Sequence, residues 1–224
     1  MNRVFVTGDV HGDIDIKKFK AFKKNTSSLD RTDIVIVCGD MGCLWEPKFD
    51  RYIQHYWEAQ PYTVVWIDGN HENFDELKEF PIEEKMGGKV QHIYENVWHL
   101  CRGETFNFYG KTFYAMGGAS SHDKAIRKEG KNWWKEELPT RTEVNKYVYK
   151  LEENKVVDYI ITHSVPDDFL PYISSYFEHD IVTNLLQVIY ENVSYKHWYS
   201  GHYHLDRDLY DNVTLIYDKI IELK

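Results

Sequence analysis

The sequence predicts an α/β protein built on parallel strands. Short β-rich runs alternate with amphipathic stretches through the first half of the chain, in the order strand, helix, strand, helix, strand. Each run leads directly into a glycine or into Asp-Gly. Because connections between parallel strands are right-handed crossovers, these strands are expected to lie side by side in one sheet, with the helices packed against it.

Two periodicities predict the elements of this half. Continuous apolar runs are typical of strands buried on both faces, and apolar residues at near-helical spacing among charged ones predict helices. The predicted strands are Val4–Thr7, Ile34–Cys38 and Val64–Ile67, and the predicted helices are Ile14–Lys24 and Phe49–Ala59.

The second half is less regular. Alternation over Val97–Ala115 predicts an antiparallel meander with a tight turn at Tyr109-Gly110-Lys111, and a charged segment with two tryptophans, His122–Pro139, follows it. The remaining predicted elements are helices over Thr142–Glu153 and Asp180–Tyr190 and strands over Val156–Ile161, His197–Ser200, Asp206–Tyr210 and Val213–Tyr217. Since no repeat, low-complexity tract or linker interrupts the chain, residues 1–224 are expected to form one domain.

The composition favours a folded protein without a broad surface for polyanions. Of the 224 residues, 42% are hydrophobic, which is enough for a sizeable core. Lys and Arg number 27 against 36 Asp and Glu, so the net charge is −9. This charge disfavours long duplex nucleic acid as a partner, and any phosphate ligand requires a local device such as a metal or a few placed cations.

Cysteine usage and hydropathy predict a cytoplasmic protein. Cys38, Cys43 and Cys101 form neither a disulfide framework nor a zinc-finger spacing, so reduced thiols are expected. The apolar run near the N-terminus is too short for a signal-peptide core. No run approaches the roughly 20 apolar residues that a membrane span needs, so no membrane partner is expected.

Metal-competent side chains follow five of the predicted strands, at the point where each strand ends. The blocks are Gly8-Asp9-Val10-His11, Gly39-Asp40, Gly69-Asn70-His71-Glu72, Thr162-His163 and Gly201-His202-Tyr203-His204. Alone, each block has an ordinary explanation, such as a turn or a hydrogen-bonded histidine. Because the carboxyl ends of parallel strands share one edge of a sheet, where ligands bind, five blocks in this order favour a common site.

The chemistry of these side chains fits a centre of two metal ions. Carboxylate oxygen and imidazole nitrogen suit Mn, Fe, Zn or Ni, and no thiolate is needed, so Cys38 and Cys43 are expected to be packing residues. Asp9 and His11 both reach past the strand end only if the chain turns there, which the neighbouring glycines allow.

Together the five blocks resemble those of the calcineurin-like binuclear metallophosphoesterases. The resemblance runs from residue 9 to residue 204. It implies an α/β fold in the form of a four-layer αββα sandwich, with the site at the carboxyl ends of the central strands, and a hydrolase acting on phosphoric esters. It also implies two divalent metal ions per chain, with Mn expected and Fe, Zn, Ni or Mg as alternatives.

The resemblance implies a role for each residue of the blocks. A bridging carboxylate holds two metals together, and water between them loses its proton near neutral pH and attacks phosphorus. One metal would be held by Asp9, His11 and His204 and the other by Asn70, His163 and His202, with Asp40 bridging the two and His71 assisting the leaving group.

One part of the family pattern is absent from this chain. The protein phosphatase branch extends the second block to Gly-Asp-x-x-Asp-Arg-Gly, whereas this chain reads Gly39-Asp40-Met41-Gly42-Cys43-Leu44-Trp45. The carboxylate that orients the catalytic histidine and the arginine that grips phosphate are both missing, which argues against protein phosphatase activity. Glu72 adjoins His71 but, as adjacent side chains seldom face each other, is not expected to replace that carboxylate.

Because that arginine is missing, another residue is expected to contact phosphate, and the segment Gly117–Trp134 is the candidate to supply it. Lys124, Arg127 and Lys128 stand at i, i+3 and i+4, which predicts a basic helix face, and Lys124 and Arg127 are the expected substrate-binding residues. The two tryptophans that end the segment could stack on a base or cap a pocket. The alternative is a solvated basic helix whose tryptophans lie in the core.

Three functions remain open from sequence alone. The first is a metal-dependent phosphoesterase acting on a small phosphate mono- or diester, with a nucleotide or cyclic nucleotide as the expected substrate. The second is a nuclease for short or single-stranded nucleic acid, and the third is a non-catalytic scaffold, which the complete ligand set disfavours. Five of the histidines that match no block are expected to be structural or at the surface: His55, His92, His99, His179 and His197.

Overall fold

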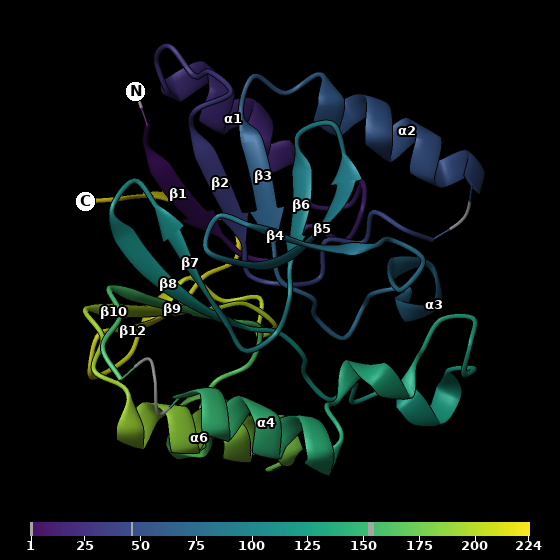
Figure 1. Ribbon diagram of the computed structural model, residues 1–224. Helices are drawn as coiled ribbons and strands as arrows, with labels where there is room; N and C mark the ends of the chain where they lie inside the picture. The colour runs from purple at the N-terminus through teal and green to yellow at the C-terminus, as the bar shows by residue number, and fades with distance from the viewer. Residues whose placement is uncertain (1, 46, 152–154) are drawn as a thin grey trace.

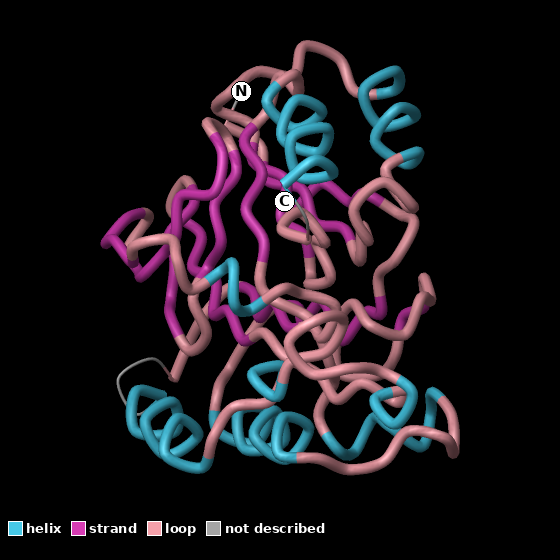
Figure 2. The backbone as a smooth tube through the Cα atoms, turned by 90° about the vertical axis from the view of Figure 1, so that its right-hand side faces the viewer, coloured by secondary structure: helices cyan, strands magenta, loops and turns pink. Residues whose placement is uncertain are grey.

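The computed structural model describes residues 2–45, 47–151 and 155–224. Two sheets lie face to face, with α1 (Lys17–Asn25) and α2 (Pro47–Glu58) outside one of them and α4 (Arg141–Leu151) and α6 (Ile181–Asn192) outside the other (Figure 1). A view turned by 90° shows the same order of layers (Figure 2). The fold is therefore the four-layer αββα sandwich that the resemblance implied.

The first sheet is built on the three strands predicted in the N-terminal half. β1 (Val4–Thr7), β2 (Ile34–Val37) and β3 (Thr63–Trp66) pair in parallel, and α1 and α2 form the crossovers between them. The full order is β13-β1-β2-β3-β6-β5-β4. The flanking strands are β4 (Ile82–Lys85), β5 (Gly88–Tyr94), β6 (Val97–Leu100) and β13 (Ile220–Leu223).

The second sheet has the order β11-β12-β10-β9-β8-β7. Its central strands β8, β9, β10 and β12 pair in parallel, so their carboxyl ends share one edge. The prediction of a strand over His197–Ser200 is confirmed. The strands are β7 (Glu104–Phe108), β8 (Lys111–Met116), β9 (Tyr159–Thr162), β10 (His197–Ser200), β11 (Arg207–Asp208) and β12 (Val213–Leu215).

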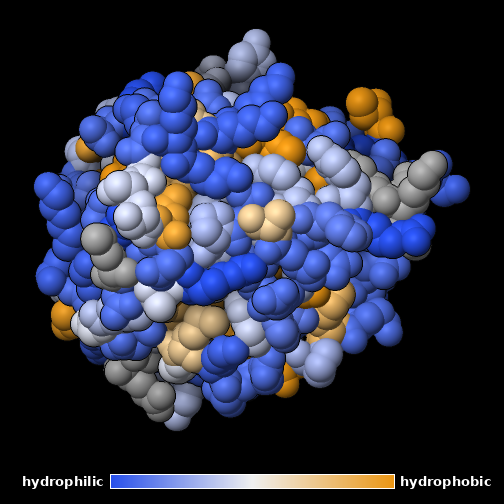
Figure 3. All heavy atoms as spheres, turned by 90° about the horizontal axis from the view of Figure 1, so that it is seen from above, coloured by the Kyte–Doolittle hydropathy of each residue, from blue (hydrophilic) through white to orange (hydrophobic). Residues whose placement is uncertain are grey.

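Three apolar layers hold the sandwich together. Val6 and Phe113 lie in the layer between the sheets, Trp57 in the layer under α1 and α2, and Leu186 in the layer under α6. Each side chain of this size stabilises the fold by about 1.5–3 kcal/mol when buried. The surface on the α1 and α2 side is mostly hydrophilic, with small separate apolar patches (Figure 3). The two sheets and their helices thus form a well-packed frame, and the loops at the strand ends are attached to it.

The predicted meander over Val97–Ala115 is wrong in part. β6 belongs to the first sheet and pairs in parallel with β3, whereas β7 and β8 form a hairpin of the second sheet. The chain changes sheets between β6 and β7, and alternation along a strand does not record which sheet the strand joins. The tight turn is confirmed, because Tyr109 and Gly110 have φ of 55° and 83°, as a two-residue hairpin loop requires.

The basic helix predicted from Lys124, Arg127 and Lys128 is wrong. The segment forms a single 3₁₀ turn, Lys124–Ile126, and Arg127 then leaves it with φ −96° and ψ 166°. The Asn132 side chain accepts a hydrogen bond from the Lys128 backbone N–H at 2.7 Å and so holds an irregular loop. These basic residues therefore do not share a helix face.

Other differences concern element ends. Ile14 precedes α1 and is 69% exposed, and Val156 precedes β9 and is 76% exposed. The strand predicted over Asp206–Tyr210 shortens to Arg207–Asp208. The helix predicted over Thr142–Glu153 is described as far as Leu151, and its last two residues lie outside the described part of the chain. Within the described residues, none of the helices has both the length and the apolar character needed to cross a bilayer.

Candidate metal centre

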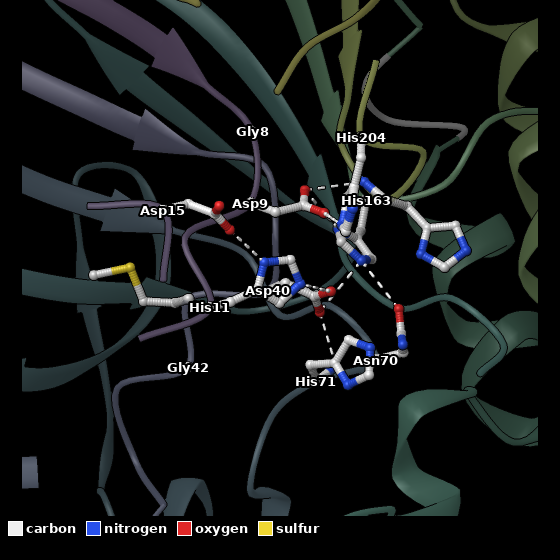
Figure 4. Close-up of polar contacts among 12 residues, drawn as sticks. Gly8, Asp9, His11, Asp15, Asp40, Gly42, Asn70, His71, His163 and His204 are labelled. Atoms are coloured by element: carbon white, nitrogen blue, oxygen red, sulfur yellow. Dashed lines mark hydrogen bonds and ion pairs between the residues drawn. The ribbon is translucent and has the colours of Figure 1, made fainter. Parts of the chain in front are cut away.

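The loops that follow five strands bring the predicted ligands to one place. Asp9 and His11 follow β1, Asp40 follows β2, and Asn70 and His71 follow β3. From the second sheet, His163 follows β9, and His202 and His204 follow β10. Figure 4 shows Asp9, His11, Asp40, Asn70, His71, His163 and His204 converging on a shared centre.

The backbone of these loops departs from ordinary conformations. The left-handed region holds His11 (φ 48°), Asp40 (φ 49°), His202 (φ 68°) and His204 (φ 51°). A non-glycine residue in this region costs on the order of 1–3 kcal/mol, and such residues gather at functional sites. The frame therefore holds these four residues in strained conformations that direct them at the centre.

Glycines let the loops approach one another. A Cβ atom on Gly39 would lie 2.1 Å from His163 Nδ1, and one on Gly69 would lie 2.0 Å from Asp40 Oδ1. Both contacts are closer than atoms tolerate, so a side chain at either position would displace a predicted ligand. This explains physically why these strands run into glycine before the polar residue.

The first group of candidate ligands is Asp9, His11 and His204. One ligand atom from each lies within 4.8 Å of the others, and Asp9 Oδ2 is 3.0 Å from His204 Nε2. His11 Nδ1 lies 2.7 Å from the carboxylate of Asp15, which leaves Nε2 to face Asp40 at 3.2 Å. A carboxylate on the far nitrogen is the usual way of orienting a metal-binding histidine. Sequence reasoning missed Asp15, although it stands four residues after His11.

Asp40 belongs to the other two groups of candidate ligands. One group joins it to His11 and His71, and the second joins it to Asp9 and His163. His163 Nε2 lies 3.3 Å from Asp40 Oδ1 and 3.2 Å from Asn70 Oδ1. Asp40 therefore stands between the two sides of the centre, which is the position that a bridging carboxylate requires; the bridging role itself stays a prediction.

His202 is placed differently from the other predicted ligands. Its backbone N–H donates to Asp9 Oδ1 at 3.0 Å, and its ring centroid lies 5.0 Å from that of His163 and 5.6 Å from that of His122. It joins none of the three groups found among the described residues. Its ring is thus next to the centre, and its role as a ligand stays a prediction.

The electrostatics of the centre suit a cation. Burial raises the pKa of Asp9 and Asp40, but the neighbouring histidines outweigh it and hold both carboxyl groups below their usual range. In turn, burial lowers the pKa of His11 and His163, but the carboxylates raise it to about 9 and about 10. Two protons thus neutralise the buried carboxylates, and divalent ions would replace them.

The donor set fits divalent metal ions. Asp9 Oδ2 is buried without a hydrogen-bond partner in the described part of the chain, although His204 lies beside it. The neighbouring nitrogen of His204, 3.0 Å away, is itself a candidate ligand atom, so this oxygen and that imidazole can bind the same cation. Two buried carboxylates with several imidazoles match the preferences of Mn, Fe and Zn.

His71 lies at the boundary between the centre and solvent. Its backbone N–H donates to Asp40 Oδ1 at 2.8 Å, and its ring centroid lies 5.6 Å from that of His11. Burial lowers the pKa of its imidazole below the usual value, and the charge of Arg127 adds to this effect. Glu72 turns away and accepts hydrogen bonds from the backbone of Met41 and Gly42, so it braces the loop that carries Asp40.

A cleft of about 1070 Å³ opens beside His11 and His71. Arg127 lines it and is held there by Asp123 Oδ1 at 2.5 Å and by the Asn132 carbonyl at 3.0 Å. Lys124 is exposed and lies outside the lining. The lining residues are His11, Asp13, Ile14, Trp45, Tyr52, His71, Asn73, Arg127, Gly130, Lys131 and Trp134.

Lys18 is a second residue that sequence reasoning missed. Its ammonium group donates to the carbonyls of Gly8, Asp9 and Tyr217 at 3.1, 2.6 and 2.6 Å, and burial lowers its pKa to about 8. It thereby holds the end of β1 against the C-terminal segment. A lysine on the helix that directly follows the first metal block was the available signal.

The residues expected to be structural supply no ligand atom to the three candidate groups among the described residues. Cys38 and Cys43 are buried free thiols, and Cys101 is half-buried and free. His92 stacks on Trp98, and His197 lies 2.8 Å from the Thr214 hydroxyl. None of the five unmatched histidines joins a candidate metal group among the described residues.

The chain belongs to the calcineurin-like phosphoesterase family, whose model matches residues 2–206. Members of this family are hydrolases of phosphoester bonds that depend on divalent metal ions. The sequence resemblance is thereby confirmed.

Individual relatives add detail. The chain is similar to the lariat debranching enzymes of Danio rerio and Gallus gallus, with 24% identity to each over 91% of its own length. It spans only 40% and 42% of the length of these two relatives. Among solved structures it is similar to the phosphopantetheinyl hydrolase of Mycobacterium tuberculosis, with a TM-score of 0.50, 16% identity, and coverage of 96% of this chain and 88% of that one. This last likeness shows the fold.

Proposed function

We propose that the protein hydrolyses a small phosphate mono- or diester, with a nucleotide or cyclic nucleotide as substrate, using two divalent metal ions. The observation that carries the proposal is the set of three overlapping groups of candidate ligands around Asp9 and Asp40, beside a cleft that also holds Arg127. The net charge of −9 makes this local cation the more significant for an anionic ligand.

Each element of the site has a task in such a reaction. Bound divalent ions would polarise the phosphoryl group and lower the pKa of water. Asp9, Asp40 and the surrounding histidines would hold them, with Mn as the expected metal. His71 lines the cleft next to the centre, where it can donate a proton to the departing oxygen. Arg127 can pair with a phosphate oxygen through a charge-assisted hydrogen bond.

A second candidate is hydrolysis of short or single-stranded nucleic acid. The similarity to lariat debranching enzymes favours it. A strong salt dependence of substrate binding would support this candidate over a mononucleotide, because counterion release grows with the number of phosphates contacted.

The test uses the purified protein reconstituted with Mn²⁺. Aryl phosphate, bis-aryl phosphate, nucleotides, cyclic nucleotides and a short single-stranded oligonucleotide are assayed in parallel, with a chelator as control. Hydrolysis of a small ester that chelation abolishes supports the proposal. Full metal loading without hydrolysis of any of these substrates overturns it and leaves the scaffold interpretation.

A further inference from the structure

One wall of the cleft that holds Arg127 is largely aromatic. Trp45 from the loop after β2, Tyr52 from α2 and Trp134 from the loop after β8 line it together with Ile14. The rings of Trp45 and Trp134 lie 5.7 Å apart at 51°, and Trp134 Nε1 is fixed by a 2.8 Å hydrogen bond to Asp75. This wall is therefore positioned by three separate segments of the frame.

Two of these apolar side chains stay in water. Tyr52 is 56% exposed and Ile14 is 69% exposed. Exposed apolar surface grouped beside a catalytic centre is typical of a ligand site, since it gains from being covered. Three of the four apolar lining side chains are aromatic, and aromatic faces favour a flat ring over a flexible aliphatic chain.

We propose that this aromatic wall binds a planar base of the substrate while Arg127 and His71 face its phosphate. The inference rests on the proposed function and narrows its substrate class to a nucleoside phosphodiester. The planar base packs on Trp45 and Tyr52, while Trp134, which is only 3% exposed, supports Trp45 from the core, and the phosphorus lies toward His11 and His71. Stacking of this kind stabilises binding to any base, because each base has a π-face.

The test compares two diesters with the same reacting bond. One is the p-nitrophenyl ester of thymidine 5′-phosphate and the other is methyl p-nitrophenyl phosphate, and both release nitrophenol. The native protein is expected to prefer the nucleoside ester in kcat/KM by at least about tenfold, as one stacked base supplies. Tyr52→Leu and Trp45→Leu should remove most of this preference while leaving the methyl ester within about twofold.

Controls separate the possible failures. Trp45→Phe keeps an aromatic face and should retain the preference, and Tyr149→Leu changes a tyrosine on α4 that is 71% exposed and should change nothing. Equal losses on both esters, or no preference in the native protein, overturn the aromatic subsite. If neither diester is hydrolysed with metal bound while aryl phosphate still is, the narrowing to a phosphodiester is overturned; if none of the three is hydrolysed, the proposed function is contradicted instead.

A second, independent observation concerns Asn70. Its amide nitrogen donates to the Ser121 hydroxyl at 3.2 Å, and that hydroxyl donates to Glu137 Oε2 at 2.6 Å. The Ser121 backbone N–H donates to the other oxygen of Glu137 at 3.0 Å. Glu137 is fully buried. Both carboxyl oxygens of Glu137 thus accept from Ser121, and this sets the direction of the hydrogen bonds that lead to Asn70.

We infer that Glu137 and Ser121 are positioning residues that aim the amide oxygen of Asn70 at the metal centre. The Ser121 hydroxyl gives its one proton to Glu137, so it can only accept from the Asn70 amide nitrogen. The amide oxygen is then left on the side of His163, 3.2 Å from Nε2. An oxygen can bind a metal there, whereas an amide nitrogen cannot.

Glu137→Gln tests the direction of these bonds at constant size. The new amide can donate to Ser121, which frees the hydroxyl to donate to Asn70 and turns the amide nitrogen toward the centre. Calorimetric titration of the metal-free protein with Mn²⁺ should show one site weakened about 10–100-fold, as loss of an orienting partner costs, and the other unchanged. Ser121→Ala should weaken the same site, whereas Ser120→Ala at the neighbouring position should not. Unchanged affinities in a folded Glu137→Gln variant overturn the inference, and so does equal weakening of both sites.

Discussion

The chain contains two buried clusters of carboxylate and imidazole groups, one around Asp68 and one around Asp9 and Asp40. Asp68 follows β3 by two residues, as Asp9 follows β1. Both Asp68 oxygens are paired within the described structure. Oδ1 lies 3.1 Å from His99 Nε2 and Oδ2 accepts from Arg102 Nε at 2.7 Å, and the other ring nitrogen of His99 lies 2.8 Å from Gln91.

The cluster around Asp9 and Asp40 lacks this completeness. Asp9 Oδ2 is buried without a hydrogen bond among the described residues, and His11, His202 and His204 adopt left-handed backbone conformations near it. In the Asp68 cluster, by contrast, Arg102 and His99 pair with both carboxylate oxygens, so this cluster stabilises the fold. The two clusters contain similar types of residue. They differ in how completely their polar atoms are paired and in the backbone strain around them, and these two properties separate the functional cluster from the structural one.

Replacement of Asp40, the carboxylate shared by the two sides of the centre, is expected to have the largest effect. Asp40→Asn removes the charge of the carboxylate that lies 3.2 Å from His11 on one side and 3.3 Å from His163 on the other, so both metal sites should weaken by more than the roughly 10–100-fold that loss of an orienting partner costs. Elemental analysis after reconstitution is expected to fall from two ions per chain toward none. His11→Ala should affect mainly one ion, and a native protein that binds about one ion or none would contradict the two-metal assignment.

His71 should separate chemistry from metal binding. His71→Ala is expected to keep the metal content and lose turnover by about 10²–10⁴-fold, as for a missing general acid. The loss should shrink on nitrophenyl esters, because a good leaving group needs less protonation. If metal content falls in step with the rate, His71 is a ligand rather than a proton donor, and the assigned roles are wrong.

Arg127 and Lys124 form a matched pair for a smaller effect. Arg127 lines the cleft and Lys124 does not, so Arg127→Ala should lower kcat/KM by about tenfold, or about 1.4 kcal/mol, while Lys124→Ala has little effect. Metal content should not change in either variant. Equal effects of the two substitutions would show that only the general charge of this loop matters.

Sequence alone predicted the frame of the site for a simple physical reason. The strands β1 and β2 are fully buried and β3 is buried except at Thr63, so hydrophobicity dictates them, and the polar blocks that follow must lie at one edge. The switch between sheets after β6 and the irregular loop around Arg127 could not be predicted in this way. They depend on which sheet edge accepts the strand and on side-chain bonds such as that of Asn132 to Lys128.

The supporting residues were harder to predict than the ligands. Ser121 and Glu137 act through contacts between segments distant in sequence, and nothing in their local pattern marks them. Asp15 stands only four residues after His11, but an aspartate at that spacing is also common in ordinary loops. Asp68 stands in a block much like the others, directly before Gly69, yet it is bound by Arg102. Only the three-dimensional pairing separates Asp68 from the candidate ligands.

Substitution of Arg102 tests the structural role of the cluster around Asp68. Arg102→Leu removes the cationic partner of Asp68 and leaves His99 as its remaining side-chain partner. Breaking a buried ion pair in this way typically costs about 3–5 kcal/mol of unfolding free energy. Urea unfolding should show this loss. Turnover and metal content per folded molecule should stay within about twofold of native values, because Asp68 belongs to none of the candidate metal groups.

The pH dependence of folding stability tests the structural role of the Asp68 cluster independently. Burial raises the pKa of Asp68, but Arg102 and His99 outweigh the effect of burial and hold this pKa well below the usual value. A carboxyl group whose folded pKa is depressed stabilises the protein above its unfolded pKa of about 3.9 and loses that contribution as pH falls toward the folded value. The native protein should therefore lose stability as pH drops below about 4, and Arg102→Leu should flatten that part of the curve. A variant that instead loses its metal ions at neutral pH while remaining folded would show that the two clusters are one functional unit.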